Sequence, residues 1–290
     1  MKHAYLILAH GSFKLLSVLL EMLDDERNDL FIHFDAKTAV DKSFFTVRHA
    51  RLYYVADSDR IDVRWGDVSQ IHAEYQLLKL AFHTGEYGYY HLISGVDLPV
   101  KSQDYIHDAC SRSDGCLFVG FVKDKAYLKK KTRARIMRYH LLTKYYKSHP
   151  FLAHVNKYLS IFLSFLKRPD DYIWASGPNW FSITPECVEV VLAKEDEVKE
   201  RFRHTFCGDE FFLQTIIAST PRLMDKVYDC EDASRQCRRL IDWKRGRPYV
   251  WRMSDKDEIA ASDAFFARKF DENVDMEIVR WIRNRYKPGL

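Results

Sequence analysis

The sequence predicts an α/β protein with a central, mostly parallel and twisted sheet flanked by helices. Near-continuous apolar runs, typical of strands covered on both faces, recur through residues 3–121. Segments with apolar residues at helical spacing separate these runs over short connections, which favours parallel strand pairing. A hydrophobic content of 47% and an aromatic content of 14% agree with a folded globular protein.

The first three strands are expected at 3–9, 30–35 and 51–57. After Gly11, leucines recur at helical spacing, and Ser12 is predicted to cap that helix. These elements form the first strand–helix–strand unit of the predicted sheet.

Another amphipathic helix is expected from residue 67 to Gly85, where glycine ends the periodic pattern. Further strands are predicted at 89–95, 115–121 and 172–177.

Three helices complete the prediction. One opens at Thr184-Pro185-Glu186, because proline suits the first helical position. A short helix is expected within 207–219, and a last one covers 276–286. The absence of repeats and linkers favours a single domain over residues 1–290.

Residues 122–168 form a basic helical insertion in this domain. A solvated helical face is one interpretation of its charge. Attachment to an anionic membrane surface, beside a lipid-linked acceptor, is the second, because Tyr, Phe and Leu accompany the Lys and Arg residues. Nucleic-acid binding has no accompanying motif, and a net charge of +4 is too mild to indicate it.

No apolar run reaches the ~20 residues that a membrane-spanning helix needs. The first residues read as a buried strand and not as a secretory signal. Six cysteines without a C-x-x-C pair make zinc binding improbable. We therefore expect reduced thiols and a cytoplasmic protein, peripheral at the inner membrane surface under the second interpretation of the insertion.

Two adjacent acids, Asp209 and Glu210, precede an apolar run. Asp209 is predicted to cap the following helix, with Glu210 as its first residue. The positive end of the helix dipole would keep Glu210 ionised, as a general base requires. The alternative is a surface acid that only complements the dipole.

Asp35 and Asp97 follow apolar strands. Ligands of open α/β sheets bind at the carboxyl ends of strands, so both are candidates for hydrogen bonds to a ribose or sugar hydroxyl. The alternative is that each caps a turn.

Seven segments appear in a characteristic order: AYLILAHGS, HFDAK, WGDVS, SGVDLPVKS, SGPNWFSITPE, GDEFFLQT and FFARKFDENVD. Together they resemble the core-2/I-branching glycosyltransferase family, which includes β-1,6-N-acetylglucosaminyltransferases and peptide O-xylosyltransferases. The resemblance covers about residues 3–275. It implies a GT-A-type fold that binds a UDP-sugar and inverts the anomeric carbon without a metal.

The resemblance also implies roles for individual residues. Glu210 matches the catalytic base, and Lys269, with Arg268 beside it, matches the contact to the donor diphosphate. A second basic contact falls on Arg245 or Arg247. The other donor-side positions are His10, His33, Asp35 and Asp97. The acceptor-side positions are Asp209 and Trp180.

A literal D-x-D, Asp57-Ser58-Asp59, offers a metal-dependent alternative. Without a metal, fixed Lys and Arg side chains must stabilise the leaving diphosphate. The sequence has GPNW where relatives commonly have a Gly-Ser pair, which leaves the acceptor contacts open.

These patterns predict an inverting transferase that moves N-acetylglucosamine from its UDP donor to an acceptor glycan, with no cofactor. A UDP-xylose or other UDP-sugar transferase is one alternative, and a non-catalytic glycan- or nucleotide-sugar-binding protein is another. A glycoside hydrolase would also need paired carboxylates, but Asp209 and Glu210 are neighbours that would point in different directions.

Overall fold

The computed structural model describes residues 1–166, 168 and 172–287. Its larger sheet has six strands in the order β3-β2-β1-β4-β7-β6. Strands β1 to β4 pair in parallel, while β7 is antiparallel to both β4 and β6. The predicted α/β class with a mainly parallel sheet is confirmed. The strands are β1 (His3–Ala9), β2 (Asn28–Phe34), β3 (Arg51–Tyr54), β4 (Tyr89–Ser94), β6 (Phe118–Val119) and β7 (Phe181–Ile183).

A second sheet of three strands joins distant parts of the chain. It has the order β5-β9-β8, formed by β5 (Asp97–Pro99), β9 (Phe266–Arg268) and β8 (Arg239–Ile241). Strand β9 lies antiparallel to β5, with Asp97 opposite Arg268. This register places Asp97 and Arg268, two residues of the predicted donor site, next to each other.

One apolar core serves both sheets. Helix α1 (Phe13–Leu23) places five leucines in it, and Phe266 of β9, the preceding Phe265 and the apolar face of α12 (Met276–Tyr286) complete it. Burying an apolar side chain of this size contributes about 1.5–3 kcal/mol, so this cluster fixes the small sheet against the large one. The other helices here are α3 (Gln103–Arg112) and α11 (Lys256–Ala261).

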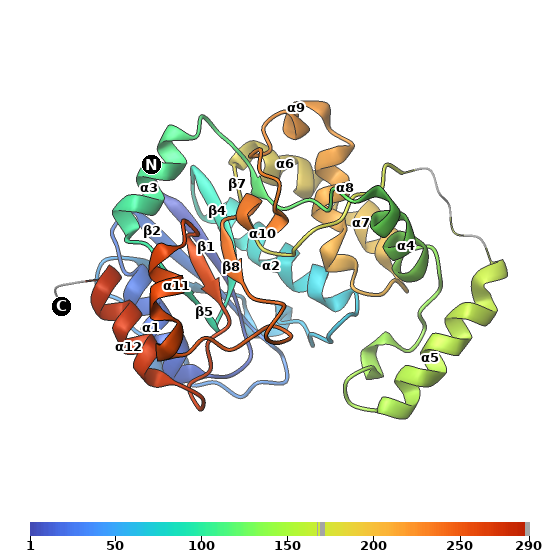
Figure 1. The fold of residues 1–290 in the computed structure, drawn as a ribbon, viewed down its shortest axis with the longest axis horizontal. Helices are drawn as coiled ribbons and strands as arrows, with labels where there is room; N and C mark the ends of the chain where they lie inside the picture. The colour runs from blue at the N-terminus through green and yellow to red at the C-terminus, as the bar shows by residue number, and fades with distance from the viewer. Residues whose placement is uncertain (167, 169–171, 288–290) are drawn as a thin grey trace.

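The opposite face of the large sheet is covered by α2 (Ser69–Thr84), α6 (Pro185–Ala193) and α8 (Phe212–Ala218), which form a second apolar cluster (Figure 1). The Tyr75 hydroxyl donates to the carbonyl of Val191 at 3.1 Å and ties α2 to α6. The layer also contains α7 (Glu195–Phe202), α9 (Pro221–Met224) and α10 (Ala233–Gln236).

The basic segment is helical and includes α4 (Lys125–Arg135) and α5 (Pro150–Phe162). Asp124 caps α4, because its carboxylate accepts the N–H groups of Ala126 and Tyr127. Figure 1 shows α5 at the edge of the molecule, away from both sheets. No helix in the described ranges has both the length and the apolar character needed to cross a bilayer.

Three local predictions are wrong. Ser12 makes no side-chain cap, because its backbone is left-handed (φ 53°). Residues 172–177 form no strand, and the strand of that region is β7. Their backbone is engaged elsewhere: Ala175 N–H donates to the Thr215 hydroxyl at 3.3 Å. The strand expected at 115–121 is short, limited to β6.

Candidate active site

Glu210 ends a short 3₁₀ turn, Gly208–Glu210, immediately ahead of α8. The prediction that it is the first residue of the helix is therefore wrong by two residues, because α8 begins at Phe212. Its Oε2 lies 2.6 Å from Lys131 Nζ and accepts a hydrogen bond from Arg135 at 2.8 Å. Its Oε1 has no hydrogen-bond partner among the described residues, and the side chain is 33% exposed. One oxygen is thus held in place while the other can accept a proton.

The two cations come from α4 of the basic segment, four residues apart and therefore on one helix face. Lys131 is buried, donates to the Ser176 hydroxyl at 2.7 Å and lies over the Phe211 ring. Burial alone would lower the pKa of Arg135, but the charge of Glu210 raises it. Part of the basic segment therefore belongs to the site and not to a solvated face.

Asp209 lies in the same turn and does not cap a helix, which corrects that prediction. Its side chain is buried, and its Oδ2 accepts from Gln70 at 3.3 Å. Burial, reinforced by the charge of Glu210, raises the pKa of Asp209 to about 7. Its contact with an acceptor stays a prediction, made from a buried position.

A third acid, Glu74 of α2, lies behind this turn and is fully buried. Burial and the neighbouring Asp209 raise its pKa well above the ordinary value. Its Oε1 accepts from Asn179 at 2.8 Å. The raised pKa of Glu74 disfavours a second negative charge beside the buried Asp209.

The segment 177–180 connects Glu210 to the small sheet. The N–H of Gly177 donates to the carbonyl of Glu210 at 3.0 Å, and the Trp180 ring stacks on Arg268 with 4.3 Å from centroid to guanidinium carbon. A Cβ at residue 177 would lie 1.8 Å from the carbonyl oxygen of Gly120, so only glycine fits there. Trp180 is therefore placed between the predicted base and the predicted donor cations.

Arg268 is fixed by its neighbours, whereas Lys269 is open. Arg268 donates to Asp97 Oδ1 at 2.8 Å and to the Ser94 hydroxyl. The other oxygen of the buried Asp97 accepts the N–H of Ser94 at 2.7 Å. Lys269 is half-buried, and its ammonium has no partner among the described residues. Asp97 positions a donor-side cation, and Lys269 remains available to an anion.

His10 follows β1 and shares an electrostatic environment with both halves of the predicted donor site. Burial lowers its pKa, Asp35 raises it, and the charges of Arg268 and Lys269 lower it further. The carbonyl of Ala9 accepts the N–H of Asp35 at 2.9 Å, which sets the ends of β1 and β2 side by side. The structure therefore brings these four predicted residues together.

His33 and Asp35 are both engaged inside the protein. His33 is buried, and its Nε2 accepts the N–H of Ile61 at 2.9 Å; burial lowers its pKa to about 4. Asp35 accepts from the N–H and the ammonium of Lys37, at 2.9 and 2.8 Å. They shape the loop at this strand end, and their contact with uridine stays a prediction.

The two alternatives for the second basic contact differ clearly. Arg245 is paired with Asp242, Asp255 and Glu258, which tie it to α11. Arg247 is exposed and has no partner among the described residues. The carbonyl of Tyr249 accepts the N–H of Lys269 at 3.4 Å, so this loop lies against Lys269. Arg247 is the candidate that a diphosphate can use.

In the D-x-D sequence, Asp57 already accepts hydrogen bonds from other side chains, and Asp59 is exposed to solvent. Asp57 accepts from Lys42 at 2.9 Å and from Arg60 at 3.3 Å, while Asp59 is exposed. Among the described residues, one group has metal-ligand spacing: the buried His3, His91 and Cys110. His91 there shares hydrogen bonds with His3 and Ser182, and burial, with the charges of His3 and Arg239, lowers its pKa well below the ordinary value. This group reads as a hydrogen-bonded chain in the core.

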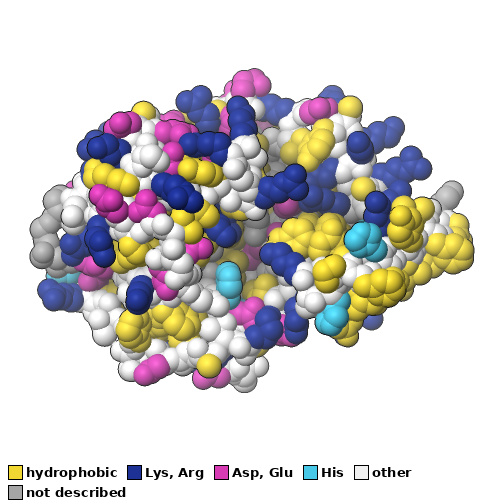
Figure 2. All heavy atoms as spheres, turned by 60° about the horizontal axis from the view of Figure 1, so that its bottom comes forward, with side chains coloured by type: hydrophobic (Ala, Val, Ile, Leu, Met, Phe, Trp, Pro, Cys, Tyr) yellow, Lys and Arg dark blue, Asp and Glu magenta, His cyan; other side chains and the backbone are white. Residues whose placement is uncertain are grey.

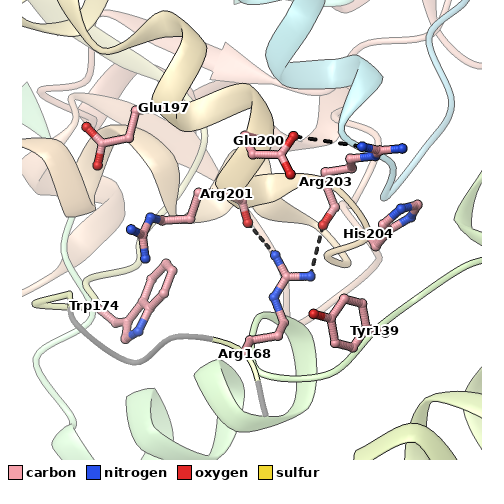
Figure 3. Close-up of a pocket in the computed structure, with 8 residues that line it drawn as sticks. All are labelled: Tyr139, Arg168, Trp174, Glu197, Glu200, Arg201, Arg203 and His204. Carbon is pink, nitrogen blue, oxygen red and sulfur yellow. Dashed lines mark hydrogen bonds and ion pairs between the residues drawn. The ribbon is translucent and has the colours of Figure 1, made fainter. Parts of the chain in front are cut away.

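Figure 2 shows a hollow near the middle of one face, with Lys and Arg side chains on its rim. A separate cavity of about 560 Å³ lies beside α7 (Figure 3). Arg168 projects into it and donates to the carbonyls of Arg203, at 2.9 Å, and Arg201. None of the predicted site residues lines this cavity, which contains Tyr139, Arg168, Trp174, Glu197, Glu200, Arg201, Arg203 and His204.

Sequence reasoning missed Lys131, Arg135 and Glu74 as parts of the site. The i, i+4 spacing of the two cations was a signal, but a helix so rich in Lys and Arg contains several such pairs. Glu74 carried no signal beyond its polar character on an otherwise apolar face of the predicted helix.

Residues 3–262 match a protein-family model described as "Branch: Core-2/I-Branching enzyme". Xylosyltransferase 2 of Rattus norvegicus is 21% identical over 315 residues, covering 99% of this chain and 34% of the relative. Xylosyltransferase 2 of Canis lupus familiaris is 22% identical with the same coverage. The chain thus spans about a third of the length of these relatives.

Among solved structures, the crystal structure of A197 from STIV matches with a TM-score of 0.26 and 10% identity. The match covers 65% of this chain and 68% of that one. A likeness at this level carries no argument about function.

Proposed function

Because the chain belongs to the Core-2/I-branching enzyme family, of GT-A-like fold, we propose that it is a glycosyltransferase that uses a UDP-sugar. The acceptor is a hydroxyl of a glycan, and the transfer inverts the anomeric carbon. N-acetylglucosamine is the sugar we propose. Xylose is the alternative that the names of the relatives favour.

The acceptor oxygen attacks the anomeric carbon while the bond from that carbon to the diphosphate breaks. Glu210 Oε1 takes the hydroxyl proton, and the diphosphate leaves with the bonding electron pair. Lys131 and Arg135 hold Oε2, so the carboxylate keeps its orientation as the proton arrives. A positioned base of this kind is worth about 10²–10⁴-fold in rate.

The departing diphosphate gathers negative charge that fixed cations must stabilise. Lys269 is the cation with a free ammonium next to β9, and Arg247 lies in the loop packed against it. The charges of Lys269 and Arg247 would stabilise the leaving diphosphate without a divalent ion. We therefore propose that the reaction is metal-independent.

The observation that carries the proposal is the short segment 177–180. It hydrogen-bonds to Glu210 at one end and stacks on Arg268, the neighbour of Lys269, at the other. This segment therefore links the proposed base to the proposed donor cations, and an in-line displacement would need these groups on opposite sides of the anomeric carbon.

Glu210→Gln tests the assignment. We expect kcat to fall by about 10²–10⁴-fold while UDP binding, measured by calorimetry, stays within about twofold. The exposed Glu26→Gln is the matched control and should change neither. Unchanged turnover in Glu210→Gln, with UDP still bound, would indicate another base or a binding protein without this chemistry.

A further inference from the structure

Helix α5 exposes aromatic side chains and buries polar ones. Phe151 and Phe162 are 76% and 71% exposed, and Tyr158 lies between them on the same side at helical spacing. Phe165, in the 3₁₀ turn that follows the helix, is 66% exposed. The residues that α5 buries are the polar Asn156 and Ser160. A helix that packs on its own protein normally shows the reverse arrangement.

Polar contacts attach α5 to the loop that precedes it, and that loop to the rest of the protein. Asn156 accepts the N–H of Leu142 at 3.0 Å, and its amide lies 3.3 Å from Nδ1 of His140. In that loop, the hydroxyl of Thr143 donates to Asp67. The polar side of α5 therefore holds the helix in place. Its aromatic side is exposed even though the helix is attached.

The charge around this helix has one sign. Residues 125–168 contain twelve Lys and Arg residues and no Asp or Glu. Lys131 and Arg135 pair with Glu210, but Lys144 and Lys157 are exposed. Lys157 lies over the ring of Tyr158, and Lys144 lies over the ring of Tyr145, shortly before α5. Figure 2 shows hydrophobic side chains gathered at the end of the molecule that carries this segment.

We propose that the aromatic side of α5, flanked by these cations, lies on an anionic lipid bilayer at the depth of the headgroups. Aromatic side chains there lose their contact with water, and the Lys side chains reach lipid phosphates. A second copy of the chain fits less well, because two such segments would face each other with like charge. The inference needs no sugar transfer and stands apart from the proposed function.

Vesicle flotation tests it with the full chain. We expect binding to phosphatidylglycerol–phosphatidylcholine vesicles, weak binding to phosphatidylcholine alone, and release at high salt. The triple variant Phe151→Ser, Phe162→Ser, Phe165→Ser should bind at least about 100-fold more weakly. Phe44→Ser, at an exposed phenylalanine of another region, is its control and should bind like the wild type.

The double variant Lys144→Glu, Lys157→Glu should lose about 25-fold or more in binding, since each basic residue near an anionic surface contributes about fivefold. Lys256→Glu with Arg280→Glu, at exposed cations elsewhere, should lose little. Equal melting temperatures would show that the variants fold. Failure of the wild-type chain to float, or self-association that the triple variant abolishes, would overturn the proposal.

Discussion

The two carboxylate oxygens of Glu210 differ in their hydrogen-bond partners, and that difference decides which of them can accept a proton. Lys131 and Arg135 both contact Oε2, which stabilises the ionised carboxylate but also restrains it. Lys131 is the more buried of the two and extends the contact to Ser176. It is therefore a positioning residue whose removal should disturb the base more than the donor.

Lys131→Met should lower kcat by about 10–100-fold while leaving KM for the donor within about threefold, since the change affects the base. Lys131→Arg should restore part of the rate, because its guanidinium can reach the same carboxylate. Steady-state kinetics across pH measure both. The neighbouring exposed Lys130→Met is the control, and an equal loss there would refute a specific role for Lys131.

These cations illustrate what could not be predicted at this scale. The proposed base and the proposed donor lysine follow from ordered segments of sequence, but the partners of Glu210 lie about 75 residues away on another helix. Among many Lys and Arg residues, tertiary packing alone selects the two that meet the carboxylate. Asp209 was likewise misread, because its burial depends on α2 and not on its own helix.

At the scale of elements, α2 places the carboxyl group of Glu74 beside the turn that carries Glu210, the proposed base. Glu74 holds its proton in the folded protein, whereas the unfolded chain releases it above the ordinary pKa of 4.5. Folding therefore takes up a proton in this range, and this group makes the protein less stable as pH rises.

Glu74→Gln should remove this pH dependence, because an amide has the shape of the neutral acid and nothing to titrate. The free energy of unfolding of the variant, relative to the wild type, should rise between pH 5 and pH 8. Urea titrations at the two pH values measure it. The exposed Glu26→Gln should show no such change, and a pH-independent difference for Glu74→Gln would mean that the acid titrates normally.

Long periodic elements were well predicted from sequence. The last helix has its predicted bounds, Met276–Tyr286, and α2 ends before Gly85 as expected. The strand predicted at 172–177 is absent because the apolar side chains of this segment pack while its backbone forms hydrogen bonds with a loop. For example, Val122 N–H donates to the carbonyl of Ser176 at 2.7 Å. Periodicity shows that a segment is buried, but it does not show where the backbone groups find partners.

For the whole molecule, the candidate donor site spans both sheets. His10 and Asp35 follow strands of the large sheet, while Arg268 and Lys269 belong to the end of β9 in the small one. A bound nucleotide would therefore add contacts across the junction of the sheets. Ligand that binds only the folded state raises the stability of the whole chain.

UDP at about 100 times its Kd should raise the Tm by about 5 °C, with or without EDTA. Lys269→Ala should abolish most of this shift, whereas Lys256→Ala at an exposed site should not. Differential scanning fluorimetry measures each case. A shift that disappears with EDTA would instead support metal binding through Asp57 and Asp59.

The pairing of β5 with β9 also has a consequence for how the protein is made. Asp97 emerges from the ribosome early, but its partner Arg268 is translated about 170 residues later. The large sheet can assemble during synthesis, yet the cations proposed to bind the nucleotide arrive only when almost the entire chain is available. A nascent or prematurely terminated chain would then contain the proposed base, Glu210, without the cations proposed to bind a donor.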